Sequence, residues 1–155
     1  MLKINTLFFV TIACFVGALS SCSADTKRLH DINGHNLPWS ELRGKWVFIN
    51  YWASWCEPCM TEIPELNRFY AGSKHNKIAL FAVNYDGLSI SEQQKLIAQY
   101  HIKYPSLKKD PKLMLRLEDI RGLPATFVFN PKGELSNVLY GGQSVSSLKE
   151  AMSIS

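Results

Sequence analysis

The sequence predicts an α/β domain whose core is a mixed β-sheet. Two apolar runs rich in β-forming residues, Trp46–Trp52 and Ile78–Val83, lie on either side of a segment with helical periodicity. This order is typical of a βαβ unit with parallel strands. A later pair of β-forming runs around a turn predicts an antiparallel hairpin. Because strands that are apolar on both faces belong in a sheet covered on both sides, we expect a central mixed sheet flanked by helices on both faces.

The start of the chain has the composition of an export signal. An early lysine precedes the apolar run Leu7–Leu19, which is too short and too early for a membrane span. The run ends in Leu19-Ser20-Ser21-Cys22, which resembles the processing box of bacterial lipoproteins, where the chain is cut before the cysteine and the cysteine is lipidated. The alternative is ordinary cleavage after Ala24. We favour the lipoprotein signal, because it also explains the cysteine at position 22.

This assignment divides the chain into three segments. Residues 1–21 are the expected lipoprotein signal peptide, and residues 22–28 form a short polar tether lipidated at Cys22. Residues 29–155 are expected to form one folded domain. Lipid on Cys22, rather than a transmembrane helix, would hold this domain at a membrane surface.

Two small elements are expected at the start of the domain. Residues 29–37 predict a hairpin, in which Asn33 and Gly34 supply the positive φ values of a tight turn. Residues 40–44 predict one helical turn, capped by Ser40 and stopped by Gly44.

Periodicity marks the remaining elements. Residues 57–71 carry apolar side chains one helical turn apart, on a face that holds Cys59, Ile63, Leu66 and Tyr70. A second helix is expected to begin at Ser89, which has capping-box spacing to Glu92, and to end before Pro105. The later elements are a short helix over 111–118, a strand over 126–129, a turn over 130–133, a strand over 135–140 and a helix over 145–152.

Cysteine usage points to redox chemistry. Of the four cysteines, Cys14 lies in the leader and Cys22 at its end, so only Cys56 and Cys59 remain in the folded part. One pair is too few for a disulfide framework. Cys56 falls at the start of the predicted helix, where free N–H groups and the helix dipole stabilise a thiolate. We therefore expect Cys56 to be an exposed attacking thiol and Cys59 a shielded resolving thiol.

Other roles for this pair and this composition are less favoured. A zinc site needs four ligands, and the histidines show no ligand-like spacing to the pair: His30, His35, His75 and His101. An inert disulfide closing so small a loop would stabilise little. The net charge of +4 is spread along the chain without a basic run, so we expect no nucleic-acid partner.

The active segment resembles a known superfamily. Asn50–Cys59, followed by Glu62-Ile63-Pro64, is similar to the active-site segment of thioredoxin-like proteins, and most similar to the TlpA/ResA/CcmG-like group of extracytoplasmic thiol–disulfide oxidoreductases. The similarity extends over the chain from Leu29 onward and includes the Gly122–Thr126 loop. It implies a thioredoxin-like fold with an N-terminal β-hairpin extension, and an enzyme that uses no cofactor and no metal.

The resemblance also implies the residues that meet a substrate. Pro124 matches the cis-proline beside the active-site helix, and Leu123 before it would face the substrate. Trp55 would form a rim of the docking surface, and Pro58 fits the first helical turn. Glu57 lies beside the attacking sulfur and opposes its ionisation, which lowers the reduction potential. The alternative for Glu57 is a plain first-turn glutamate.

Glu62 is a candidate proton carrier. It lies one turn beyond Cys59, on the flank of the apolar face, where partial burial would raise its pKa. In ResA-like relatives a glutamate at this place is associated with the active site. Asn50 stands where thioredoxins often have a buried acid, which makes Glu62 the better candidate. The alternative is a solvated surface glutamate.

Together these observations predict a membrane-tethered thiol–disulfide oxidoreductase that reduces disulfides in exported proteins. The resemblance suggests apocytochrome c as a substrate and a membrane electron donor of the DsbD/CcdA type. We expect an extracytoplasmic, lipid-anchored monomer, on either the inner or the outer membrane. The alternatives are a disulfide oxidase or isomerase, and a copper-relay lipoprotein that binds copper(I) through its thiols. A peroxidase is disfavoured, because no threonine stands three residues before either cysteine.

Overall fold

The sheet of the domain has four strands and mixed direction. The computed structural model describes residues 27–73 and 77–153. The strands are β3 (Trp46–Trp52), β4 (Ile78–Asn84), β5 (Ala125–Phe129) and β6 (Leu135–Tyr140), in the order β4-β3-β5-β6. β3 and β4 are parallel, and the other two pairs are antiparallel. The predicted βαβ unit and C-terminal hairpin are therefore confirmed. The predicted signal peptide, Cys22 and most of the tether lie outside the described residues.

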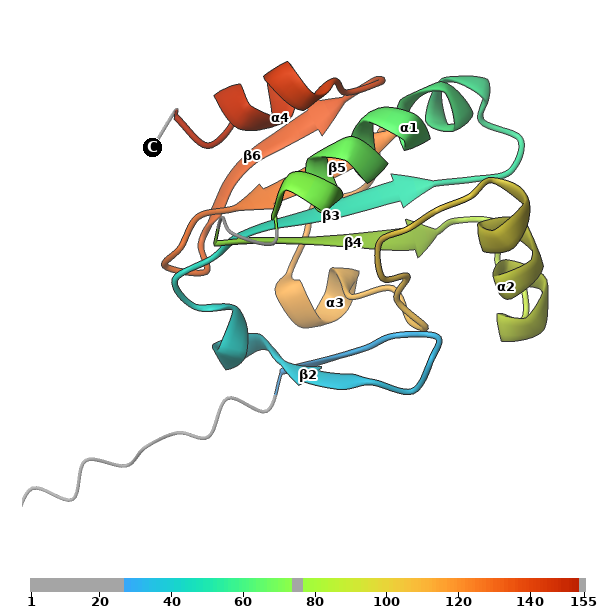
Figure 1. The fold of residues 1–155 in the computed structure, drawn as a ribbon. Coiled ribbons are helices and arrows are strands. Elements are labelled where there is room, and N and C mark those ends of the chain that lie inside the picture. The colour runs from blue at the N-terminus through green and yellow to red at the C-terminus, as the bar shows by residue number, and fades with distance from the viewer. Residues whose placement is uncertain (1–26, 74–76, 154–155) are drawn as a thin grey trace, which may run out of the picture.

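Three helices cover one face of the sheet. They are α1 (Glu57–Gly72), α2 (Ile90–Gln99) and α4 (Val145–Glu150), and Figure 1 shows α1 and α4 above the sheet. Their inward side chains join one apolar core with Phe48, Trp52 and Val128 of the sheet. Ser89 and Glu92 form the predicted capping box at the start of α2. Leu66 of α1 and Leu148 of α4 are fully buried in this core.

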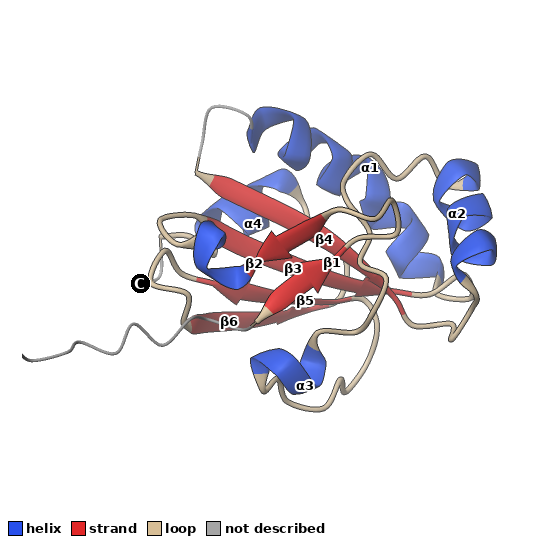
Figure 2. Cartoon of the chain, turned by 90° about the horizontal axis from the view of Figure 1, so that it is seen from below, coloured by secondary structure: helices blue, strands red, loops and turns tan. Residues whose placement is uncertain are grey.

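The other face is covered mainly by the N-terminal hairpin. Its strands are β1 (Arg28–His30) and β2 (Asn36–Pro38), followed by the one-turn 3₁₀ helix η1 (Trp39–Leu42). Figure 2 shows the hairpin in front of the sheet, with α3 (Lys112–Leu115) beside it. Helices therefore lie on both faces, but those on this face are single turns. α3 is shorter than predicted because Arg116 adopts a left-handed conformation with φ 56°.

β4 lies at an edge of the sheet, although its apolar sequence predicted a central strand. The backbone at 105–107 covers that edge: Ala82 N donates to Pro105 O at 2.8 Å, and Leu107 N donates to Ala82 O at 2.8 Å. The same segment continues to the hairpin, where Lys108 N donates to His30 O at 2.8 Å. A covered edge tolerates an apolar strand, because it offers no free pairing surface.

Two local predictions for the start of the domain are wrong. Gly34 has a positive φ of 90°, but Asn33 does not. The Asp31 carboxylate instead accepts hydrogen bonds from the N–H groups of Asn33 (2.9 Å) and His35 (2.8 Å), which gives a wider loop. Ser40 is not a cap either, since η1 begins one residue earlier, after Pro38. The buried ring of Trp39 fixes that start by packing edge-on against Phe129 at 4.9 Å.

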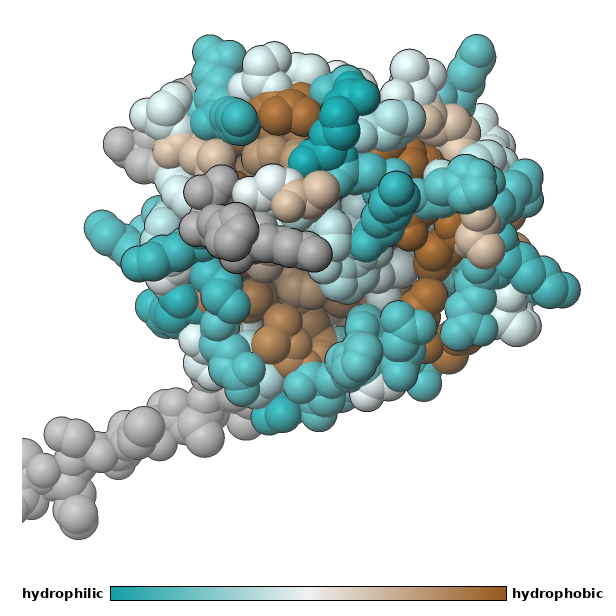
Figure 3. All heavy atoms as spheres, viewed as in Figure 1, coloured by the Kyte–Doolittle hydropathy of each residue, from teal (hydrophilic) through white to brown (hydrophobic). Residues whose placement is uncertain are grey.

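One face of the molecule is predominantly polar (Figure 3). In the space-filling view, polar residues cover most of the visible face and apolar residues show only in patches between them (Figure 3). Across the described segments, no helix is both long enough and apolar enough to cross a membrane.

The burial of Leu66 predicts a large stability effect. Leu66→Ala removes a fully buried side chain between α1 and the sheet, and should lower the free energy of unfolding by about 2–5 kcal/mol. Leu113→Ala is the matched control, because Leu113 is 90% exposed on α3 and its loss should change stability by less than about 0.5 kcal/mol. Urea unfolding measures both. Equal effects of the two substitutions would contradict this packing.

Candidate redox-active site

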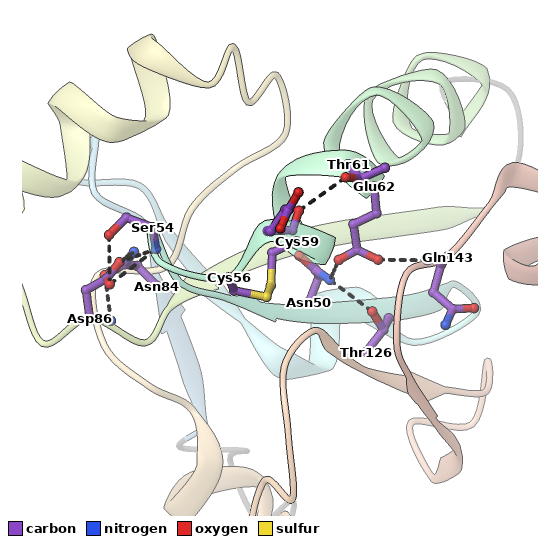
Figure 4. The surroundings of a disulfide bond; sticks show 11 residues. Asn50, Ser54, Cys56, Cys59, Thr61, Glu62, Asn84, Asp86, Thr126 and Gln143 are labelled. Atoms are coloured by element: carbon purple, nitrogen blue, oxygen red, sulfur yellow. Dashed lines mark hydrogen bonds between the residues drawn. A yellow bond between two sulfur atoms is a disulfide. The ribbon is translucent and has the colours of Figure 1, made fainter.

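The two cysteines lie where β3 turns into α1. Cys56 is the N-cap of α1, with extended backbone angles of φ −94° and ψ 95°. Its N–H donates to Ala53 O at 3.1 Å, and its carbonyl accepts hydrogen bonds from the N–H groups of Cys59 (3.0 Å) and Met60 (3.2 Å). A disulfide joins Cys56 to Cys59 (Figure 4). The predicted place of the pair, at the mouth of the helix, is confirmed.

Cys56 is more buried than the sequence suggested. Its exposed fraction is 5%, against 0% for Cys59. Both belong to the core cluster under α1 that includes Trp52 and Ile63. Cys56 is therefore slightly more accessible than Cys59, as expected, but the prediction that Cys56 is exposed is wrong. The side chain that stands out at this end of the molecule is Trp55, which is largely exposed.

The proline loop lies against the same end of the sheet. The Leu123–Pro124 peptide bond is cis, as the resemblance implied. In the β3–β5 register Tyr51 pairs with Ala125, so Pro124 stands just beyond the paired strands, where β3 passes into the active-site turn. Pro124 O accepts a hydrogen bond from Gly141 N at 2.9 Å. Leu123 is half-buried and packs against the cores on both faces of the sheet.

Glu62 is held inside the protein by two other elements. Its side chain is 2% exposed. The carboxylate accepts hydrogen bonds from Asn50 Nδ2 at 2.7 Å and from the backbone N–H of Gln143 at 2.8 Å. Asn50 Nδ2 also donates to Thr126 Oγ1 at 3.0 Å. Figure 4 shows this network on the Cys59 side of the disulfide. The predicted burial of Glu62 is confirmed, and the side chain is more deeply buried than the sequence suggested.

The surroundings of Glu62 bring the pKa of its carboxyl group close to neutral pH. Burial raises its pKa to about 7, although the hydrogen bonds from Gln143 and Asn50 oppose the shift. Cys59 and Glu62 are three residues apart on α1, and residues at that spacing are neighbours on one face of a helix. A carboxyl with this pKa beside a resolving cysteine is suited to accept and return a proton.

A groove gives this network access to solvent. It has a volume of about 570 Å³ and is lined by residues from α1 and from the loop before α4: Glu57, Pro58, Thr61, Glu62, Glu65, Gly142, Gln143 and Ser144. We call it the acidic groove, since three of its described lining residues are glutamates and none is basic. Glu57 and Pro58 are exposed at its rim, which agrees with their predicted place beside a docked substrate.

A second polar network lies on the other side of the pair and was missed in the sequence. The Asp86 carboxylate accepts hydrogen bonds from Ser54 N (2.9 Å), Ser54 Oγ (3.0 Å) and Asn84 Nδ2 (2.6 Å) (Figure 4). These contacts fix the turn just before Cys56. The available signal was the position of Asp86 two residues after the end of β4, because the carboxyl ends of neighbouring parallel strands meet at one edge of a sheet.

Thr126 and Gln143 were missed for a different reason. Gln143 donates to Glu62 through its backbone N–H. Thr126 is linked to Glu62 only indirectly, because its hydroxyl accepts a hydrogen bond from Asn50. Neither role depends on a motif. No pattern in the sequence marks them.

Comparison with known proteins agrees with this geometry. A model of the AhpC/TSA family matches residues 22–138. The thiol-disulfide oxidoreductase ResA of Bacillus subtilis (strain 168) is 32% identical over 126 residues, which cover 81% of this chain and 70% of the relative. ResA of Oceanobacillus iheyensis is 29% identical over 161 residues, covering 94% of this chain and 83% of that protein.

Solved structures show the same fold. StoA from Bacillus subtilis superposes with a TM-score of 0.67 at 23% identity, covering 81% of this chain and 94% of that one. A secreted thiol-disulfide isomerase from Corynebacterium glutamicum gives a TM-score of 0.69 at 16% identity, covering 81% of this chain and 80% of that one. The thioredoxin-like fold expected from the sequence is therefore confirmed.

The pKa of Glu62 predicts how stability depends on pH. The pKa is about 7 in the folded protein and 4.5 in an exposed glutamate, so between these values the folded chain keeps a proton that the unfolded chain releases. The contribution of Glu62 is full below pH 4.5 and is lost as pH rises through 7, which lowers the free energy of unfolding by up to about 3 kcal/mol.

Glu62→Gln tests this assignment, because the amide cannot ionise. Urea unfolding of the oxidised protein between pH 4.5 and 8 should show the decline in the natural chain and a nearly flat profile in the variant. A decline that persists in Glu62→Gln would assign it to another group.

Proposed function

The chain belongs to the AhpC/TSA family and is a thioredoxin-like thiol–disulfide oxidoreductase of the ResA type, and from this we propose that it acts as a reductant of disulfides in exported proteins. The observation that carries the proposal is the carboxylate environment of the cysteine pair. Glu62 is buried beside Cys59, and Glu57 and Glu65 line the same groove without a basic residue among its described lining.

Negative charge near the pair favours the disulfide over the dithiol. Reduction of the pair creates a thiolate at Cys56, and nearby carboxylates oppose that charge while leaving the neutral disulfide unaffected. The helix dipole at the N-cap acts in the other direction. A dithiol whose oxidised form is the more stable donates its electrons readily, so the pair has a low reduction potential.

The reaction proceeds as two thiol–disulfide exchanges. The Cys56 thiolate attacks one sulfur of the substrate disulfide, which forms a Cys56–substrate bond and releases the other substrate sulfur as a thiolate. Cys59 then gives its proton to the Glu62 carboxylate and attacks Cys56, which forms the Cys56–Cys59 disulfide and releases the second substrate thiolate. The substrate gains two electrons and leaves as two thiolates. Glu62 holds the one proton that Cys59 gave up and passes it to one of them, the other takes its proton from solvent, and the enzyme pair is oxidised.

Substrate contacts follow from the surface around the pair. We place the substrate backbone along Leu123 and Pro124, with Trp55 as an exposed apolar rim. Glu57 and Pro58 border the substrate on the acidic groove side. Since Cys56 itself is 5% exposed, a substrate must approach closely, which favours extended or unfolded segments over disulfides inside folded domains.

The proposed setting is outside the cytoplasm, at a membrane. The support is the signal-like leader with its lipoprotein-type box at Cys22. Disulfides persist in such compartments, so a reductant there needs a supply of electrons. We propose a membrane dithiol donor of the DsbD/CcdA type, and apocytochrome c as one substrate.

Trapping tests the substrate and the attacking residue together. Cys59→Ser leaves Cys56 to form the mixed disulfide but removes the thiol that resolves it, so the variant should accumulate covalent adducts with its substrates in cells. Non-reducing electrophoresis and mass spectrometry identify the partners. The matched control is Cys59→Ser combined with Cys56→Ser, which should trap nothing. Adducts that are equally abundant in this control would refute attack by Cys56.

A further inference from the structure

A second groove lies at the opposite end of α1 from the cysteine pair. It has a volume of about 820 Å³ and is lined by Gly44, Trp46, Arg68, Phe69, Gly72, Lys77, Ile78, Pro131, Val145, Lys149 and Met152. Three of these residues are basic and none is acidic, and we call this the basic groove. Figure 1 shows the ends of α1 and α4 and the start of β3 together at the left, whereas α1 begins at the right.

The basic groove combines cations with apolar walls. Lys77 and Lys149 are exposed, and neither has a carboxylate within ion-pair distance among the described residues. Arg68 pairs with Glu65 one turn earlier on α1. The apolar part of the lining consists of Trp46, Phe69, Ile78, Val145 and Met152. This combination suits contact with a lipid bilayer, which has anionic headgroups above hydrocarbon. The aliphatic stems of the lysines can lie along apolar area while their ammonium groups reach the anionic headgroups.

Further cations surround the groove. Arg43 and Lys45 stand on either side of Gly44, and Arg43 Nη1 donates to the carbonyl of Lys132 at 2.8 Å. All three residues are exposed. The nearby acid Glu134 accepts a hydrogen bond from Asn130 Nδ2 at 3.0 Å. Two further acids are close in sequence to these cations: Glu41 in η1, and Glu150, which follows Lys149 in α4. The surface around the groove therefore carries both charges, with basic residues in the majority.

The N-terminal tether joins the domain at this end. Lys27 O accepts a hydrogen bond from Trp39 N at 2.9 Å. The indole of Trp39 in turn lies against Gly133, in the turn whose Pro131 borders the groove. Four residues, 23–26, separate Lys27 from Cys22. Even fully extended, the five steps from the Cα atom of Cys22 to that of Lys27 cover no more than about 17 Å, at roughly 3.4 Å per step.

We propose that the basic groove and its flanking cations rest on an anionic membrane surface, with the cysteine pair facing away from the lipid. The lipid anchor at Cys22, on which this rests as part of the proposed function, brings this end of the domain to the bilayer. Phosphate-bearing headgroups then meet Lys77, Lys149 and Arg68. The seven residues of β3 separate the groove from the active-site turn, so the disulfide stands clear of the lipid, open to soluble substrates and to any part of the membrane donor that projects from the bilayer.

Vesicle binding of the chain from Ser23 onward, without lipid, tests the surface apart from the anchor. This chain keeps all the described residues, 27–73 and 77–153, which hold the four-stranded sheet and the cores on both of its faces. It should co-sediment with vesicles of phosphatidylglycerol and phosphatidylcholine in equal parts, and not with phosphatidylcholine alone. Binding should weaken as salt is raised.

Charge reversal locates the contact. Lys77→Glu with Lys149→Glu should weaken binding to the anionic vesicles by about tenfold or more. The matched control, Lys95→Glu with Lys103→Glu, makes the same change in net charge on exposed residues outside the basic groove and should weaken binding far less. Equal losses in the two variants, or no binding to anionic vesicles, would overturn the proposal.

Two further measurements separate the alternatives. Inorganic phosphate at millimolar concentration should not displace the vesicles; displacement would indicate a site for a free anion. Disulfide reductase activity should be unchanged in the Lys77→Glu, Lys149→Glu variant, because the groove is remote from the cysteines. If the natural chain has no disulfide reductase activity, the proposed function is refuted. If it has this activity but does not bind the anionic vesicles, only the proposed membrane-facing surface is refuted.

Discussion

The buried Glu62 carboxylate is the constraint on which the site depends. A carboxyl group inside an apolar core is costly unless hydrogen bonds satisfy it. Here a side chain from β3 and a backbone N–H from the loop before α4 do so. Because Glu62 itself lies on α1, three separate elements must come together around it. The same contacts that make burial tolerable fix α1, and therefore the cysteine pair, against the sheet.

The burial of Glu62 also supports the proton transfer that we propose for the pair. With a pKa near 7, the group is close to half-ionised at neutral pH, so it can take a proton from one thiol and return it later. Asn50 contributes without titrating: it donates to Glu62 and to Thr126 and carries no charge of its own. The acid that titrates, Glu62, therefore lies on α1 with the cysteines, and the neutral hydrogen-bond donor, Asn50, lies on β3.

Charge is sorted along α1, and this separates chemistry from attachment. The acidic groove lies at the start of the helix and the basic groove at its end. Glu57 in the first turn complements the positive end of the helix dipole, whereas the last turn of α1 holds no basic residue. In the proposed orientation the basic end faces lipid, and the acidic, redox-active end faces away from it.

The main elements were predictable because they depend on local periodicity. β3, α1 and β4 follow from apolar spacing, and the positions of Cys56 and Cys59 at the start of α1 follow from a motif. The edge position of β4 was not predictable, because the segment at 105–107 that covers it has no repeating pattern. The contact between Glu62 and Gln143 was not predictable either, because it uses a backbone N–H that almost any residue would supply.

The most direct test of the account is the reduction potential of the Cys56–Cys59 pair, measured by equilibration with glutathione buffers at pH 7. The carboxylate environment predicts a reducing pair, with a potential near that of thioredoxin, about −270 mV. A potential near about −120 mV, typical of a strong oxidant such as DsbA, would contradict the assignment as a reductant.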